Sequence, residues 1–227
     1  MRPCDETSVF DLDALLNGCA SKPRYVYAVS TRNLSTNMML TTHALVGALL
    51  ALPVAVVAPG YAPAAVVAGF VGGSFPDLDV LARHRRTLHF PRYYGYVALP
   101  AAFLALAYPT TATVTATLFF VGAWAHSLMD VVGGSPEPRP WEAKMERAVY
   151  DHRAKRWLPP LRWIRYDGAP EDFALVLVVA VPVTYLAPDG FVYVVAVALV
   201  ISAAYTVLRK RIGLLAEDAE ATPFVED

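Results

Sequence analysis

The feature that most constrains this chain is a series of six long apolar stretches that are almost free of charged residues. They lie at residues 40–58, 61–80, 93–109, 111–133, 173–187 and 190–208. A transmembrane helix needs about 20 mostly apolar residues, so stretches of this length predict membrane spans. We therefore predict an all-α, polytopic membrane helical bundle of about six transmembrane helices, with a cytoplasmic loop between the fourth and the fifth.

The composition agrees with this prediction. Hydrophobic residues make up 56% of the 227 residues and charged residues 17%, whereas soluble domains average about 45–50% and about 25%. Disorder, a collagen-like fibre and an ordinary soluble enzyme are disfavoured, and a soluble all-α core is the remaining alternative. The net charge of −1 indicates no nucleic-acid partner. Both cysteines, Cys4 and Cys19, lie in the first twenty residues, so neither a disulfide framework nor a cysteine zinc ribbon can be built.

The positions of the basic residues predict the topology. The 19 Lys and Arg occur in four places: the N-terminal tail, residues 81–92, residues 135–170 and the stretch after the last span. With six spans these four segments lie on one side of the bilayer, and the positive-inside rule assigns that side to the cytoplasm. We expect a protein of the cytoplasmic membrane, in contact with the lipid bilayer, with both termini in the cytoplasm.

The segments outside the spans differ in character. Residues 1–37 have no clear periodicity and lack the shape of a signal peptide. We expect either that translation begins at Met38 or Met39, or that residues 1–37 form a loosely ordered cytoplasmic extension. Residues 38–215 would form the membrane domain, and the acidic residues 216–227 a disordered tail.

One sizeable polar segment, residues 134–172, separates the fourth and fifth spans. Within it Trp141, Met145, Val149 and His152 recur at three- and four-residue steps, which predicts a helix. The tryptophans and arginines that come later in the segment are typical of an element at the level of the lipid headgroups. Both a solvated linker with an interfacial helix and a substrate-binding element are compatible with this pattern.

Candidate functional residues gather at the cytoplasmic ends of the spans. The predicted topology brings seven of them to one membrane face: His43, Asp77, Asp79, His84, His89, His126 and Asp130. A cap, a turn or a local hydrogen bond explains any one of them alone. Ionisable groups beside apolar spans are nevertheless costly and usually functional. Histidines with carboxylates and no thiolate suit zinc, or else manganese or iron, as two or three ions or as one ion with supporting residues.

Four sequence elements resemble a known family. They are Thr42-His43, Pro76-Asp77-Leu78-Asp79, His84-Arg85 with His89, and Gly122 with His126 and Asp130, in that order. Over residues 39–134 they resemble the YdjM-like membrane-bound metal-dependent hydrolases. From Pro138 to Asp172 the chain resembles archaeal, halophilic members.

That family looks related to the zinc-dependent phospholipase C and P1 nuclease group, which is all-α and binds zinc through His and Asp. The resemblance implies that His43, Asp77 or Asp79 or both, His89, His126 and Asp130 are metal ligands. It makes His84 and Arg85 candidates for ligation or phosphate binding. The family usually has Gly, Thr and Ser where this chain has Arg86, Leu88 and Phe90, which puts hydrogen bonding around His89 and the usual substrate in doubt.

The function that we predict is metal-dependent hydrolysis, chiefly of phosphoesters, by metal-activated water at the cytoplasmic membrane face. Asp79 or Asp77 would take the proton of the water, and Arg85 and Arg86 would hold the phosphate. The main alternative is a metal-ion transporter or a metal-binding membrane sensor. A haem protein with His43 and His126 as axial ligands and an inactive membrane scaffold are further alternatives.

Overall fold

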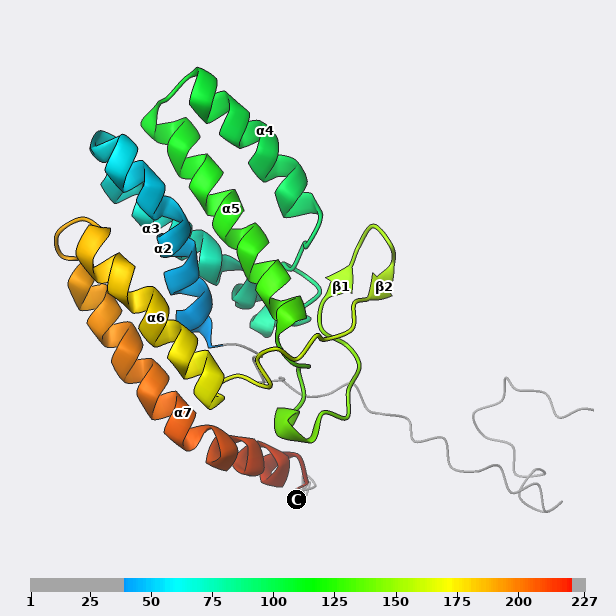
Figure 1. The fold of residues 1–227 in the computed structure, drawn as a ribbon. Coiled ribbons are helices and arrows are strands. Elements are labelled where there is room, and N and C mark those ends of the chain that lie inside the picture. The colour runs from blue at the N-terminus through cyan, green and yellow to red at the C-terminus, as the bar shows by residue number, and fades with distance from the viewer. Residues whose placement is uncertain (1–38, 222–227) are drawn as a thin grey trace, which may run out of the picture. The chain divides into compact units, whose positions relative to one another are not determined.

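The computed structural model describes residues 39–221, which fold as an all-α helical bundle and confirm the predicted fold class (Figure 1). Residues 1–37 and the end of the chain beyond Ala221, for which the sequence analysis also made predictions, lie outside the described residues. The α-helices are α2 (Leu40–Val57), α3 (Ala62–Ser74), α4 (Tyr93–Ala107), α5 (Thr111–Val132), α6 (Pro170–Leu186) and α7 (Phe191–Ala221).

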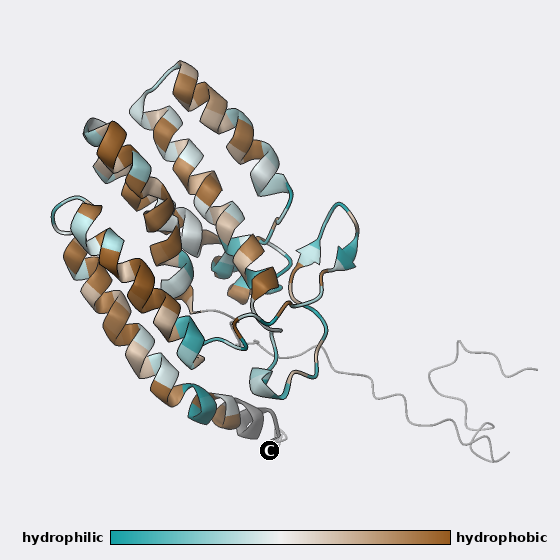
Figure 2. Cartoon of the chain, in the orientation of Figure 1, coloured by the Kyte–Doolittle hydropathy of each residue, from teal (hydrophilic) through white to brown (hydrophobic). Residues whose placement is uncertain are grey.

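Within residues 39–221, four segments are long and apolar enough to cross a membrane: Leu40–Val57, Pro59–Leu81, Thr111–Val132 and Phe191–Leu215. Helix α4 is apolar but shorter. Hydrophobic residues cover the helices, while the hydrophilic residues concentrate in the segments at one end of the bundle (Figure 2). These helices indicate a membrane protein. The identity of the membrane and the cytoplasmic location of the polar end stay predictions.

Each predicted apolar stretch corresponds to a helix, and local sequence explains where the boundaries shift. The second stretch changes from α-helix to the 3₁₀ helix η2 (Phe75–Leu81), where Pro76 cannot donate a helical hydrogen bond. Helix α5 begins at a capping box, in which Thr110 and Thr113 bond to each other's backbone N–H. Helix α7 runs on to Ala221, into the segment predicted to be a disordered tail.

Helix α3 lies between α2 and α5 and contacts both at backbone distance. A Cβ atom added to Gly73 would lie 2.3 Å from the carbonyl oxygen of His43 in α2, and one added to Gly72 would lie 2.1 Å from that of Phe119 in α5. Neither position tolerates a side chain, because real Cβ atoms do not approach so closely. The two glycines therefore let α3 pack directly against α2 and α5, the two helices that carry candidate ligands.

The prediction of a helix from Trp141 to His152 is wrong. This segment contains the 3₁₀ helix η3 (Pro140–Glu142) and then extended chain, which leads into a short antiparallel pair, β1 (Tyr150–Asp151) and β2 (Arg156–Trp157). Ala143 adopts a left-handed backbone with a φ of 53°, and the backbone N–H groups of Lys144 and Met145 donate to the Glu137 carboxylate. Tertiary hydrogen bonds thus replace the helical ones that the spacing suggested.

Two buried carboxylates tie the helices together at the polar end of the bundle. Asp172, at the start of α6, accepts hydrogen bonds from the Met39 backbone N–H at 2.9 Å, the Thr42 hydroxyl at 2.7 Å and the Gly168 backbone N–H at 3.0 Å. Asp167 forms an ion pair with Arg209 of α7 at 2.8 Å. The contacts of Asp172 fix the starts of α2 and α6 beside His43, and the ion pair of Asp167 ties the segment before α6 to α7.

Candidate metal centre

The structure brings all seven predicted histidines and aspartates to one end of the bundle. His43 lies in the first turn of α2, Asp77 and Asp79 in η2, and His126 and Asp130 in the last turns of α5. His84 and His89 lie in the connection between η2 and α4. The sequence analysis predicted these residues at one membrane face; in the fold they lie close together, and the membrane face stays a prediction.

Four of the seven direct their ligand atoms at a common centre: Asp77, His89, His126 and Asp130. The Nε2 atoms of His89 and His126 are 3.1 Å apart. Asp130 Oδ2 lies 2.9 Å from His89 Nε2 and 3.5 Å from His126 Nε2. Asp77 Oδ1 lies 3.3 Å from His126 Nε2 and 3.7 Å from His89 Nε2. This set is named the inner cluster below.

The dimensions of the inner cluster fit a metal ion. Ligands at about 2.0–2.1 Å from a tetrahedral ion lie about 3.3–3.4 Å from one another. The five ligand–ligand distances given above span 2.9–3.7 Å around that value. The buried His and Asp groups could therefore hold a metal ion, as the sequence predicted.

Hydrogen bonds on the outer sides of the His126 and His89 rings determine which nitrogen of each neutral ring carries the proton. His126 Nδ1 donates to the carbonyl oxygen of Gly73 at 2.6 Å, and His89 Nδ1 donates to Asp79 Oδ2 at 2.9 Å. In the neutral rings both Nε2 atoms then present lone pairs to the centre. Burial by itself lowers the pKa of His89, but hydrogen bonds to Asp130 and Asp79 outweigh it and raise that pKa. The inner cluster thus attracts positive charge.

Asp79 lies outside the inner cluster and orients its surroundings. Its Oδ1 accepts from His84 Nδ1 at 2.9 Å and from the Arg85 backbone N–H at 3.3 Å. Its Oδ2 accepts from the Leu88 backbone N–H at 3.0 Å and from His89. These four bonds use the acceptor positions of a carboxylate. The predicted proton transfer to Asp79 stays a prediction and would require one of these bonds to break.

His43 and His84 flank the inner cluster from two sides. The His43 ring stacks on that of His126 with 3.8 Å between centroids, and its Nε2 lies 3.3 Å from Asp130 Oδ1. His84 meets the His89 ring edge to face at 5.5 Å. His84, His89 and Asp79 form a second group in which ligand atoms lie close together. Direct metal contact by His43, Asp79 or His84 stays a prediction.

Arg85 is buried against the inner cluster. Its Nη2 atom donates to Asp130 Oδ1 at 2.8 Å, and its Nη1 atom faces the carbonyl oxygens of Asp130, Gly134 and Ala148 at 3.2–3.4 Å. Burial lowers the pKa of Arg85, with Asp130 opposing that effect, and the high intrinsic pKa of a guanidinium keeps it charged. The predicted contact of Arg85 with a substrate phosphate stays a prediction.

The β1–β2 hairpin covers the connection that carries these residues. The Tyr150 backbone N–H donates to the Arg85 carbonyl oxygen at 3.0 Å, and His152 Nε2 donates to that of Arg86 at 2.6 Å. The Arg86 guanidinium lies 4.4 Å from the centroid of the Tyr150 ring. Phosphate binding by Arg86 stays a prediction. The sequence analysis did not predict the hairpin, because it is held by hydrogen bonds to backbone carbonyl oxygens, which leave no signal in the sequence.

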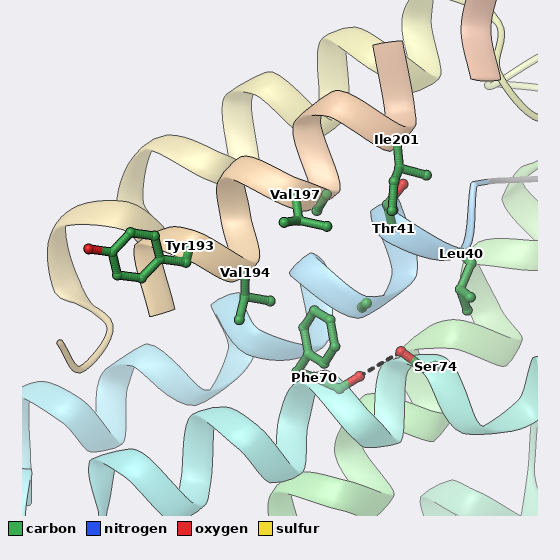
Figure 3. Close-up of a pocket in the computed structure, with 10 residues that line it drawn as sticks. Leu40, Thr41, Phe70, Ser74, Tyr193, Val194, Val197 and Ile201 are labelled. Carbon is green, nitrogen blue, oxygen red and sulfur yellow. Dashed lines mark hydrogen bonds between the residues drawn. The ribbon is translucent and has the colours of Figure 1, made fainter. Parts of the chain in front are cut away.

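An apolar groove of about 450 Å³ runs between α2, α3 and α7, beside the site (Figure 3). Of its three hydroxyl groups, that of Thr41 is bonded to Ser202 and that of Ser74 to the Phe70 carbonyl oxygen, and the third belongs to Tyr193. The remaining lining is aliphatic and aromatic, with Tyr193, Val194, Val197 and Ile201 labelled in the view. The groove therefore offers a surface for apolar chains and no catalytic group.

Comparison with protein-family models, curated proteins and solved structures found no match. The resemblance to the YdjM-like family consequently rests on the sequence elements alone and stays a prediction.

Proposed function

We propose that this protein is a membrane-bound, metal-dependent hydrolase that acts on phosphoesters at the cytoplasmic face of the membrane. The observation that carries the proposal is the set of atoms directed at the centre of the inner cluster. Two imidazole lone pairs and two carboxylates converge there, and the ring nitrogens on the far side are committed to Gly73 and Asp79. Four acceptors that face one another favour a shared cation, and histidine with carboxylate suits zinc first, with manganese or iron as alternatives.

His89, His126, Asp77 and Asp130 would hold the ion. When bound, it would supply Lewis acidity and a water molecule acidic enough to ionise near neutral pH. The outer hydrogen bonds of the two histidines keep their Nε2 atoms aimed inward, so the ligands need little rearrangement.

The partial exposure of Asp77 supports access by a substrate. Its side chain is 10% exposed, whereas those of His89, His126 and Asp130 are at most 1% exposed. A substrate would therefore approach past Asp77. The connection between η2 and α4 also carries the exposed Arg83, whose positive charge suits a phosphoester.

Ion transport is a weaker candidate because the described helices hold no relay of ionisable residues. The candidate ligands all lie at one end, and the six helices carry no Asp, Glu, His, Lys or Arg along the described stretch toward the opposite end. A transport path through the bilayer usually contains such groups.

The test uses the full chain, purified in detergent. Bound metals are measured by mass spectrometry, and hydrolysis of bis(p-nitrophenyl) phosphate is followed before and after chelation and on adding zinc or manganese. We expect bound metal, loss of activity on chelation, recovery on metal addition, and loss of both properties in His126→Gln. His152→Gln, which alters the one histidine outside the site, should retain both.

Absence of any bound transition metal would refute the proposal, as would activity that survives both chelation and His126→Gln. Metal uptake into sealed vesicles that contain the protein, without phosphoester hydrolysis, would favour the transporter instead.

A further inference from the structure

Asp130 presents its two carboxylate oxygens to two different surroundings. Oδ2 faces His89 and His126 in the inner cluster. Oδ1 faces outward, 3.3 Å from His43 Nε2 and 2.8 Å from Arg85 Nη2. In two-metal sites a carboxylate in this position bridges ions about 3.5–4 Å apart. The outer oxygen and His43 are therefore the pair of ligands that a second ion would use.

That outer position is adjacent to a fixed positive charge. Arg85 is 1% exposed and reaches Asp130 from a backbone with a φ of 61°. A left-handed conformation is unfavourable for a residue with a side chain and persists where the surroundings impose it. Here the Asp79 carboxylate binds the Arg85 N–H and the Tyr150 N–H binds the Arg85 carbonyl oxygen. The fold thus holds the guanidinium against Asp130 Oδ1.

The second group of candidate ligands, Asp79, His84 and His89, offers no better place for a second ion. Asp79 already accepts four hydrogen bonds, two on each oxygen. A second ion there would have to displace the bond that holds His89 in position.

We propose that the centre holds a single divalent ion and that Arg85 takes the place of a second cation beside Asp130. This inference rests on the proposed metal-dependent function. Arg85 is then a positioning residue, and His43 packs beside the ion without binding it.

The charge balance of the buried site supports one ion. With neutral histidines, the charged side chains are the carboxylates of Asp77, Asp79 and Asp130 and the guanidinium of Arg85. One divalent ion together with this guanidinium balances the three carboxylates, whereas a second ion would leave two uncompensated positive charges. Uncompensated charge is costly in a buried site. The nearby Asp167 has its own ion pair with Arg209.

The experiment measures stoichiometry and does not depend on turnover. Full-length protein in detergent is dialysed against Mn²⁺, and the bound ion is counted by mass spectrometry and examined by electron paramagnetic resonance. We expect one ion per chain and the resolved hyperfine pattern of isolated Mn²⁺. Arg85→Gln should bind more than one ion per chain and show exchange coupling, because Asp130 Oδ1 and His43 become available. The matched control Arg86→Gln should stay at one ion.

His43→Gln provides an independent arm if Arg85→Gln does not fold. It should keep one ion per chain, because His43 lies outside the coordination of that ion. Two ions per chain in the unaltered protein, a coupled Mn²⁺ spectrum, or loss of an ion in His43→Gln would overturn the inference while leaving the hydrolase proposal intact. A protein that binds no transition metal at all would refute both.

Discussion

The Nδ1 atom of His126 donates to the carbonyl oxygen of Gly73 over 2.6 Å, and the same glycine packs against the backbone of His43. One residue of α3 therefore sets the orientation of a histidine on α5 and the position of a histidine on α2. The geometry of the centre consequently depends on close helix packing as much as on the ligands.

Gly73→Ala should disrupt both the bundle and the centre. The new methyl group would lie 2.3 Å from the His43 carbonyl oxygen, and overpacking of this kind costs about 1–3 kcal/mol or more. We expect a lower thermal midpoint in detergent and weaker metal binding. Gly60→Ala is the matched control, because a methyl group there meets nothing within 4 Å. Equal midpoints for the two variants would contradict the packing argument.

Asp79→Asn should weaken metal binding without removing a ligand of the inner cluster. The amide cannot accept the hydrogen bonds of His84 and His89 as the carboxylate does, so the His89 ring loses its orientation. Changes of such supporting groups typically reduce metal affinity about 10–100-fold. Competition with a chromophoric chelator measures the dissociation constant. Asp189→Asn, at an exposed position outside the site, should leave it unchanged.

Asp172→Ala should destabilise the polar end of the bundle. Three donors, from Met39, Thr42 and Gly168, would lose their buried acceptor, and each such loss costs about 1–3 kcal/mol. Glu171→Ala removes the adjacent carboxylate, whose ion pair with Arg165 is solvent-accessible and worth about 0–1 kcal/mol. Denaturant midpoints should fall clearly for the first variant and little for the second. The reverse order would contradict this assignment.

The architecture was largely predictable from the sequence, because apolar stretches must form helices in a bilayer. The seven candidate residues were predictable for a related reason. Ionisable residues at the ends of the spans, such as His43 and His126, have few other places to lie once the topology follows from the basic residues.

The hairpin and the role of Arg85 could not be predicted. The spacing of Trp141 and Met145 is helical, yet Glu137 and the Arg85 carbonyl oxygen capture the backbone N–H groups of that segment. Likewise, an arginine beside two histidines suggests phosphate binding, and only the fold reveals that its guanidinium contacts Asp130. Long-range hydrogen bonds of this kind leave no periodic pattern in the sequence.

Acid should loosen the hairpin through Asp151. Burial by itself raises the pKa of this carboxyl group, but the N–H groups of Ala154 and Arg153 and the Arg92 side chain outweigh it and hold the pKa below the ordinary value of 3.8. A lowered native pKa means that the stabilisation is complete above 3.8 and is lost as the pH falls through the native value. Between about pH 5 and pH 3, the denaturant midpoint of Asp151→Asn should therefore fall less than that of the unaltered protein. Parallel losses would contradict this role.

The order of the ligands along the chain has a consequence for biosynthesis. The inner cluster draws on η2, the connection after it and the end of α5, and Arg85 is held in part by the Ala148 carbonyl oxygen in the following segment. A nascent chain that ends before α5 therefore contains only half of the ligands. Under the proposed function the ion would therefore be captured late in synthesis, after the described helices α2, α3, α4 and α5 have been made. It would then link the segment that follows α3 to the end of α5.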